Sequence, residues 1–582
     1  MLLHRKGKSS SVPALRSNDG TWVLESAEKA NLFASTWLAK QTLPPMHDED
    51  LQLLAAPADH LGFAPIRLRT TLKFLKALDV TVATGPDTLP ARILQKVAHV
   101  ISAPLTILCR RILQEKHWPK LWRYHHLVPI YKRKSVYDAN NYRGVHITSN
   151  LSKVAERVIG APMLNYFARH ESFGLHQWAY RPHRSSKDLI TLLVSIWIRA
   201  ICSGRCVGAY LSDIAGAFDR VFKPFMLRKL QSRGVAEPYI SFLSSFLERR
   251  FGQVCVEDCK STEMILEDQV FQGTVLGPPL WNIFFSDIVS AMAVPKTGKA
   301  FADDLNVFHE FDRNAPERQI MRRLHRCRDS VHQWGKRNRV EFDPGKENFV
   351  IMHPVRGTGD DFKLLGLLLD CKLHMDGAIT DILKRARPKL HTLMRSRPYY
   401  NDVDMVLQFK THILGIIESN IGSIYHATNT VLAPLDRLAT SFVHALNMEV
   451  EEAFMNYNLA PSALRRDIAM LGFLHKYNLP NVHPHIRELF PPCRVGGTHN
   501  KQMWDIMTFE NGTLFQNEMR RRSVFQLVHV YNALPQNVVS LSLVSEFQHE
   551  LTQFARNKCN AGHADWQTFL SPRHFRGSLT LV

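Results

Sequence analysis

Apolar residues recur along the first part of the chain with the period of an amphipathic helix, and then with that of a strand. Between residues 89 and 114 they follow the three- and four-residue spacing of a helix face. Residues 126–134, HLVPIYKRK, are typical of a short strand that ends in a basic turn. Before them, residues 1–88 are polar and rich in turns, with one helical stretch at 26–41. The pattern predicts an N-terminal extension, then a helical layer ahead of a sheet.

Four apolar runs in the middle of the chain have the composition of strands, and helical stretches separate several of them. These runs are residues 207–212, 299–304, 349–352 and 363–369. The helical period returns after residue 370, where an apolar stripe from Ile379 to Leu393 runs beside basic residues and Pro388 is expected to kink or divide the helix. Such a basic helix is more often a solvated surface than a nucleic-acid contact. Helical segments follow to the C-terminus, so the chain is predicted to be an α+β protein.

Composition narrows the class of protein. With 582 residues, 45% of them apolar, the chain can bury a large core divided into about three to five lobes. The formal charge of +20 raises the local concentration of polyanions, which favours nucleic acid as a partner without establishing it. Nine scattered cysteines suit reduced thiols in an intracellular protein. The most apolar stretch, from Val275, is broken by two prolines and an aspartate, so no membrane anchor is predicted.

Two adjacent carboxylates, Asp303 and Asp304, interrupt the apolar run FADDLNVF. Neighbouring residues of a strand face opposite sides of the sheet, and burying an uncompensated carboxylate is costly. We therefore expect the pair in an exposed hairpin turn rather than inside a strand. An ordinary polar turn would also explain both aspartates.

A second acid, Asp213, ends the apolar run that precedes DIAGAFD. If the two strand ends meet, Asp213, Asp303 and Asp304 converge and could hold two divalent cations about 4 Å apart. Such a pair of cations activates an attacking hydroxyl and stabilises the oxygens of a leaving phosphate. Hard oxygen ligands suit Mg²⁺, which also takes oxygens from substrate phosphates. The arrangement predicts phosphoryl transfer from a nucleoside triphosphate.

The segments LSDIAGAFDRV, FQGTVLGPPLWNIFFSDI and FADD resemble, in order and spacing, the palm motifs of reverse transcriptases, specifically those of non-LTR (LINE-type) retrotransposons. Other segments are similar to the upstream and fingers motifs of that family: TGPDTLPARIL, HWPKLWRYHHLVPIYKR, NYRGVHITSNLSKVAERVI and QWAYRPHRSSKDLI. LLGLLLD resembles its primer-grip segment. The resemblance covers roughly residues 70–400, which is far more than a single motif.

The resemblance implies a role for each matching residue. Asp213 and Asp303 would be the principal metal ligands, Asp304 the third acid, and the carbonyl of Ile214 a further oxygen ligand. Phe218 matches the steric gate, an aromatic ring that occupies the space a ribose 2′-hydroxyl would need. From its own sequence position alone, Phe218 could equally be a core residue.

Further matches concern the nucleotide. Lys132 and Arg143 stand where the fingers of the family carry cations that bind the triphosphate, although surface cations are also common. Gln272 and Gly273 match the segment that contacts the incoming nucleotide and the template. Lys346 resembles a lysine that protonates the departing pyrophosphate.

The chain departs from the family pattern at two glycines. Gly144 stands where the family often has proline, and Gly216 where motif A usually has a larger polar residue. Neither change removes a charge that the reaction needs. They therefore bear on efficiency or subfamily rather than on the type of reaction.

By this resemblance the fold is a right-hand polymerase. The expected parts are an N-terminal extension or linker (1–89), fingers (90–205), palm with the catalytic core (206–375), thumb (376–450) and a C-terminal helical region of unknown role (451–582). The expected activity is RNA-directed DNA synthesis from a primer 3′-hydroxyl in retrotransposition by target-primed reverse transcription. Two Mg²⁺ ions, or Mn²⁺ in their place, would serve as cofactors, and RNA template, DNA primer or target DNA, and dNTPs as partners. An intracellular protein of the nucleus and cytoplasm is expected.

Other interpretations stay open. A group II intron-type or telomerase-like reverse transcriptase would carry a maturase or telomerase RNA-binding domain, and neither is recognised. A decayed polymerase that only binds RNA would retain the fold, although intact Asp213, Asp303 and Asp304 argue against it. No endonuclease or RNase H acidic set is recognised, so the chain is expected to polymerise DNA without cutting its own target.

Overall fold

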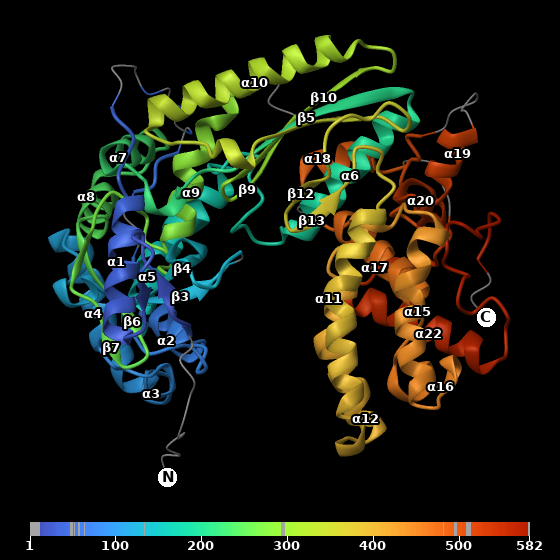
Figure 1. Ribbon diagram of the computed structural model, residues 1–582, viewed down its shortest axis with the longest axis horizontal. Coiled ribbons are helices and arrows are strands. Elements are labelled where there is room, and N and C mark those ends of the chain that lie inside the picture. The colour runs from blue at the N-terminus through green and yellow to red at the C-terminus, as the bar shows by residue number, and fades with distance from the viewer. Residues whose placement is uncertain are drawn as a thin grey trace. The chain divides into compact units, whose positions relative to one another are not determined.

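The computed structural model describes residues 12–579 apart from 47–50, 52, 56, 58, 63–64, 133, 293–296, 481, 494–497 and 508–513. The chain divides into two compact units, each built from three separate stretches of sequence (Figure 1). Unit 1 comprises Met1–Tyr180, Ser212–Leu305 and Arg326–Glu347. Unit 2 comprises Arg181–Leu211, Asn306–His325 and Asn348–Val582.

Unit 1 is a sheet covered by helices. Its strands have the order β4-β3-β6-β7, and β8 also pairs with β6. β3 pairs antiparallel with β4 and parallel with β6. The strands are β3 (Tyr124–Tyr131), β4 (Tyr142–Ile147), β6 (Arg250–Val256), β7 (Cys259–Lys260) and β8 (Met264–Leu266), with a separate ribbon of β1 (Leu15–Arg16) and β2 (Trp22–Val23). The helices are α1 (Ser26–Lys40), α2 (Leu68–Lys76), α3 (Ala91–Lys96), α4 (Ala98–Glu115), α5 (Asn150–Arg169), α7 (Lys223–Ser232), α8 (Glu237–Phe246) and α9 (Gly277–Phe285).

The first helix is part of the core of unit 1. Apolar residues of α1 recur at helical spacing, and Phe33 and Trp37 are buried in one cluster with Tyr142 of β4 and Val254 of β6. The ring of Phe33 meets those of Trp37 and Tyr142 at centroid distances of 5.2 and 5.1 Å. Figure 1 shows α1 beside β6, against which it packs. The helix predicted at 26–41 is therefore confirmed, and it folds onto the sheet.

A second sheet has the strand order β11-β5-β10-β9. Its strands are β5 (Arg205–Ser212), β9 (Gly298–Phe301), β10 (Asp304–Asp312) and β11 (Asn348–Met352), and α10 (Glu317–Asn338) follows β10 in the chain. The division between the units falls at the last residue of β5 and near the start of β10. Tyr210 of β5 pairs with Phe349 of β11, and their rings stack at 5.2 Å. These strands confirm the predictions at 207–212 and 349–352.

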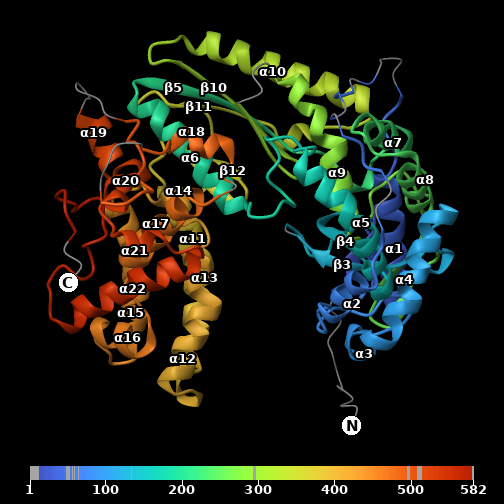
Figure 2. The ribbon, with the colours of Figure 1, turned by 180° about the vertical axis from the view of Figure 1, so that it is seen from behind.

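Unit 2 is mainly helical. Leu189, Leu193 and Trp197 of α6 (Ser186–Cys202) are buried. The later elements are β12 (Phe362–Leu364), β13 (Leu367–Leu369), α11 (Asp376–Arg395), α12 (Asp402–Phe409), α13 (Gly415–Ile417), α14 (Ile421–Ile424), α15 (Asn429–Ala445), α16 (Val450–Tyr457), α17 (Ser462–Tyr477), α18 (Pro484–Leu489), α19 (Leu514–Arg521), α20 (Val524–Asn532), α21 (Gln536–Val539) and α22 (Val544–Asn560). α17 packs against α15, α20 and α22 (Figure 2). The predicted helical content after residue 450 is confirmed.

Three expectations about elements need correction. The strand predicted at 363–369 is a hairpin of β12 and β13, because Leu365 and Gly366 both have positive φ and reverse the chain. Pro388 lies inside α11 and does not divide it. Asp303 lies in the predicted turn, but the turn is half-buried rather than exposed, and Asp304 begins β10.

Mixed helices and sheets agree with the predicted α+β class. Within the described ranges, no helix combines the length and the apolar character needed to cross a membrane.

Candidate active site

Asp213 follows the last residue of β5, at the point where an apolar strand ends. Its backbone is fixed by a short antiparallel contact with the segment after α10. The Asp343 N–H donates to the Asp213 carbonyl at 3.0 Å, and the Ala215 N–H donates to the Glu341 carbonyl at 3.0 Å. Ile214 between them is buried. Gly216 then has φ +69°, a left-handed conformation that a residue with a side chain rarely adopts.

Asp303 lies in the tight turn that joins β9 to β10, and a side chain from elsewhere holds that turn. Ala302, just before it, has φ +58°. The amide of Gln177 bonds both backbone groups of Ala302, accepting from the N–H at 2.9 Å and donating to the carbonyl at 3.1 Å. The indole of Trp281 donates to the same carbonyl at 3.1 Å. Gln177 and Trp281 are both fully buried, so the turn is fixed from behind.

The two strand ends bring Asp213 and Asp303 within hydrogen-bond reach of each other. Burial raises the pKa of Asp303, and the charges of Asp213 and Asp304 raise it further. Burial, with the charge of Asp213, raises the pKa of Asp304 to about 6. Three carboxylates therefore repel one another here. Carboxylates gathered in this way are typical of sites for divalent cations, because bound cations offset their repulsion.

The predicted convergence is shown for two of the three acids. Asp213 and Asp303 line one pocket, whereas Asp304 is the first residue of β10, where neighbouring side chains turn to opposite faces. In the part of the chain that the structure describes, no three His, Cys, Asp or Glu side chains gather closely enough to hold a metal ion. Lys346 instead forms an ion pair with Asp213, and it lies 3.4 Å from Asp343. Partial burial alone would lower the pKa of Lys346, but these two carboxylates raise it.

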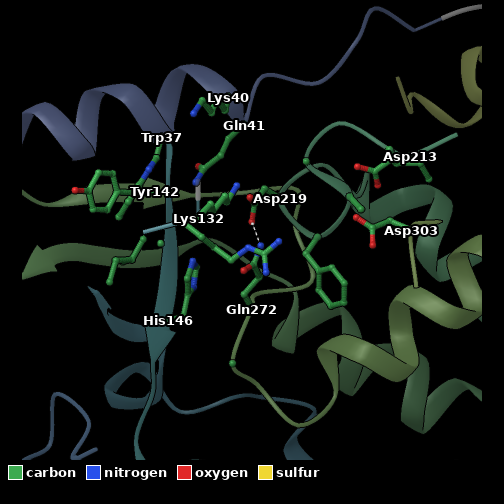
Figure 3. Close-up of a pocket in the computed structure, with 18 of the residues that line it drawn as sticks. Trp37, Lys40, Gln41, Lys132, Tyr142, His146, Asp213, Asp219, Gln272 and Asp303 are labelled. Carbon is green, nitrogen blue, oxygen red and sulfur yellow. Dashed lines mark hydrogen bonds between the residues drawn. The ribbon is translucent and has the colours of Figure 1, made fainter. Parts of the chain in front are cut away.

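The pocket beside these acids has a volume of about 370 Å³ and is lined entirely by unit 1 (Figure 3). Lys132 and Arg143 reach it from adjacent strand ends of the β3–β4 hairpin, where Ile130 pairs with Arg143. Partial desolvation and the charge of Arg143 lower the pKa of Lys132. Asp219 faces these cations, and burial raises its pKa to about 6 despite their opposing effect. The pocket therefore combines several cations with partly protonatable acids, which suits a polyanionic ligand.

Phe218 lines the same pocket between two other aromatic rings. Its centroid lies 6.1 Å from that of Tyr180, edge to face, and 5.8 Å from that of Trp281, stacked. These contacts hold the ring in one orientation at the pocket wall. Phe218 is only half-buried, so it has an exposed surface toward the pocket.

Gln272 and Gly273 also line the pocket. The Gln272 amide donates to Asp219 at 3.3 Å (Figure 3). Gly273 has φ +84°, and a Cβ there would lie 2.2 Å from the His146 carbonyl, so the backbone approach requires glycine. The fully buried Glu156 fixes the residues that follow by accepting from the N–H groups of Val275 and Leu276 at 2.7 and 3.0 Å.

Several residues that line the pocket were not predicted from the sequence. They are Trp37, Lys40 and Gln41 from the region of α1, His146 from β4, and Tyr180. Trp37 also explains Gly144, because a Cβ at residue 144 would lie 2.7 Å from the Trp37 ring. Trp37 and Lys40 were visible in the sequence, but nothing indicated which surface they meet.

Comparison with known proteins agrees with this geometry. Residues 130–369 match the family described as reverse transcriptase (RNA-dependent DNA polymerase). This chain carries a reverse transcriptase domain. Every site residue predicted from the sequence, from Lys132 to Lys346, lies inside the domain, whereas α1 lies before it.

Proteins similar to this chain come from mobile elements. The RNA-directed DNA polymerase from mobile element jockey of Drosophila funebris is 25% identical over 421 residues, covering 66% of this chain and 45% of that protein. The probable RNA-directed DNA polymerase from transposon BS of Drosophila melanogaster is 26% identical over 51% of this chain and 34% of its own length. The retrovirus-related Pol polyprotein from the type-1 retrotransposable element R1 of Bradysia coprophila is 25% identical, over 47% of this chain and 27% of that protein. The jockey match thus spans about half the length of the relative.

Proposed function

We propose that this protein copies RNA into DNA from a primer 3′-hydroxyl, as the polymerase of a non-LTR retrotransposon. The observation that carries the proposal is the meeting of Asp213 and Asp303 beside a pocket lined by Lys132 and Arg143. Carboxylates at one end and cations at the other match a nucleoside triphosphate whose α-phosphate lies at the acids. The names of the relatives support RNA as the template.

The acids fit a divalent metal site. They are hard oxygen donors, and the raised pKa values of Asp303 and Asp304 express a repulsion that bound cations would relieve. Asp213, Asp303 and the Ile214 carbonyl would hold the ions, and Asp304 would add its negative charge beside them. When bound there, two Mg²⁺ ions, or Mn²⁺ in their place, supply activation of the 3′-hydroxyl and neutralisation of charge on the phosphates.

The other residues bind and orient the substrates. Lys132 and Arg143 bind the β- and γ-phosphates, and Gln272 and Gly273 contact the nucleotide and the template from the pocket wall. The 3′-hydroxyl gives its proton to water, and its oxygen forms the new bond to the α-phosphorus as the bond from that phosphorus to the pyrophosphate oxygen breaks. Lys346, an ammonium in the pocket lining, donates a proton to the departing pyrophosphate.

We also propose the division into fingers (90–205), palm (206–375), thumb (376–450) and a C-terminal helical region (451–582). The wider role is target-primed reverse transcription, in which a nick in target DNA supplies the primer. Such a protein is made in the cytoplasm and acts in the nucleus. The kinship with polymerases of mobile elements supports this role.

The test is extension of a DNA primer on an RNA template with dNTPs and Mg²⁺. Asp303→Asn should lower the rate about a thousandfold, because a lost metal ligand costs about 4 kcal/mol in the transition state. Its affinity for the primer–template should change little, since that affinity rests on cations. Asp258→Asn removes the same charge at an exposed turn and serves as the control. Extension by Asp303→Asn at the rate of the unaltered protein would refute the site.

A further inference from the structure

The C-terminal end of α1 forms part of the wall of the nucleotide pocket. Trp37, Lys40 and Gln41 all line it (Figure 3). Their position is fixed on both sides. Trp37 is buried in the core shared with β4 and fills the space above Gly144, next to Arg143. At the helix end, the Arg220 guanidinium donates to the Lys40 carbonyl at 2.7 Å, and Arg220 closely follows Phe218 and Asp219.

Lys40 adds a positive charge to the group that faces this pocket. It interacts electrostatically with Lys132, whose pKa it lowers, and with Asp138 and Asp219, whose charges favour protonated Lys40. Burial is the largest influence on Lys40 and lowers its pKa, as expected for an ammonium withdrawn from water. Lys40 and Arg143 thus both act on Lys132 as like charges, and Asp138 and Asp219 offset the charge of Lys40 only in part. Folding such a group together is unfavourable unless an anion binds it.

The ammonium group of Lys40 has room for further hydrogen bonds. Within the described residues its ammonium has one hydrogen bond, a long one of 3.5 Å to the Asn140 carbonyl. A lysine in the last turn of a helix is favoured by the helix dipole alone, so its presence there is not by itself informative. Its half-buried position on the pocket wall, with a cationic neighbour, is what points to a ligand.

We propose that Lys40 is a third phosphate-binding cation, which contacts the triphosphate of the incoming dNTP together with Lys132 and Arg143. This inference rests on the proposed polymerase function and extends its nucleotide site to a helix outside residues 130–369. A triphosphate spreads its charge over many phosphate oxygens, so a further cation beside Lys132 and Arg143 has oxygens to contact. Phosphates of a nucleic-acid strand share this chemistry, and the experiment separates the two sources.

The experiment compares Lys40→Ala with the unaltered protein. The KM for dNTP in primer extension should rise about tenfold, as expected for loss of one charge-assisted hydrogen bond. The Kd for primer–template, measured by fluorescence anisotropy, should stay within about twofold. Lys40→Arg should restore most of the dNTP affinity. Lys76→Ala, which removes an exposed lysine from the last turn of α2 away from the pocket, should change neither quantity.

A second experiment measures dNTP binding without nucleotide incorporation. A primer ending in a dideoxynucleotide forms a complex that the next correct dNTP stabilises, and Lys40→Ala should need about tenfold more dNTP for that stabilisation. An unchanged dNTP requirement in both assays would overturn the inference while leaving the polymerase proposal intact. A loss of primer–template affinity with unchanged KM would also overturn it, in favour of strand phosphates. Stabilisation by dNTP in an unaltered protein that cannot extend primers would instead refute the polymerase function alone.

Discussion

At the scale of single residues, Phe218 illustrates how a packed aromatic side chain can select deoxyribonucleotides over ribonucleotides. Tyr180 and Trp281 hold its ring at 6.1 and 5.8 Å, so the ring cannot easily turn away from the pocket. Exclusion of a ribose 2′-hydroxyl requires a ring that stays in place, because a mobile ring could move aside and admit the hydroxyl. The stacking also explains why the sequence left a core role open, since Phe218 is both packed and exposed to the pocket.

Phe218→Ala should therefore admit ribonucleotides. Loss of the ring volume should lower the ratio of dNTP to rNTP incorporation by about tenfold or more, with a smaller change in dNTP incorporation itself. Phe218→Tyr keeps the ring and should keep most of the selectivity. The Phe218→Ala protein should have the same unfolding temperature as the unaltered protein. If its ratio of dNTP to rNTP incorporation were then unchanged, the steric gate would be ruled out.

The acids predict a link between pH, metal ions and stability. The pKa values of Asp303 and Asp304 are raised to about 7 and about 6 from a usual value of 3.8, so these groups hold protons more tightly in the folded state than in the unfolded state. That proton binding stabilises the metal-free protein at low pH, and the contribution is lost as pH rises through the raised pKa values. Bound Mg²⁺ should replace it above about pH 7.

The rise in Tm on replacing EDTA by Mg²⁺ should therefore be larger at pH 8 than at pH 5.5. At ten times its Kd a ligand adds about 1.4 kcal/mol, or about 2–4 °C for a unit of this size. Asp303→Asn should lose most of the effect at pH 8. Equal rises in Tm at the two pH values would show that these carboxylates do not bind the ion.

Sequence reasoning succeeded at this scale where chemistry is local. An acid at the end of an apolar strand predicted the meeting of Asp213 and Asp303, which the structure confirms. The contact between Arg220 and the Lys40 carbonyl joins residues 180 positions apart, and no local period contains such a pairing. The roles of Lys132, Arg143 and Lys346 remain predictions until variants are measured.

At the scale of elements, the turn between β9 and β10 depends on a partner outside it. Ala302 adopts a left-handed conformation that costs about 1 kcal/mol for a residue other than glycine. Gln177 offsets that cost by bonding both backbone groups of Ala302, and its own Oε1 also accepts from the Ala179 N–H at 3.0 Å. Gln177 thus positions Asp303 without reaching the substrate pocket.

Gln177→Leu should keep the buried volume but remove both bonds. We expect the kcat of primer extension to fall about tenfold or more with little change in the KM for dNTP, because the metal ligand is displaced while the phosphate cations stay in place. More Mg²⁺ should be needed for half-maximal activity, an effect that a general loss of stability would not produce. Ala302→Gly, which relieves the left-handed strain, should partly rescue Gln177→Leu. An unchanged Mg²⁺ requirement would contradict this role.

The sequence predicted strands correctly where polar residues mark both ends of an apolar run. The runs that became β5 and β11 are short and bounded by polar residues. The run at 363–369 was misjudged because leucines continue through the turn, so that only Gly366 marks the reversal. Periodicity describes the faces of an element, but it does not identify the surface against which α1 packs.

At the scale of the whole molecule, the limits of the matched domain do not coincide with the limits of either unit. Residue 130 lies inside β3, the strand between β4 and β6. The segment 130–369 also omits α1, which supplies Phe33 and Trp37 to the core of unit 1. In unit 2 it omits α14 and α19, both of which pack against the apolar α6. The reverse transcriptase domain is therefore a unit of sequence similarity rather than of folding.

A fragment of residues 130–369 should accordingly fail to fold cooperatively. Removing α1 alone takes two buried aromatic side chains out of the core, each worth about 2–3 kcal/mol of burial, and total stabilities are only about 5–15 kcal/mol. Calorimetry should show a broad or absent transition for the fragment and a sharp one for the complete chain. The fragment should also bind a hydrophobic dye and lose its near-ultraviolet circular dichroism. A sharp transition and native-like aromatic signals from the fragment would show instead that the domain folds without α1 and the later helices, and that their packing is dispensable to the fold.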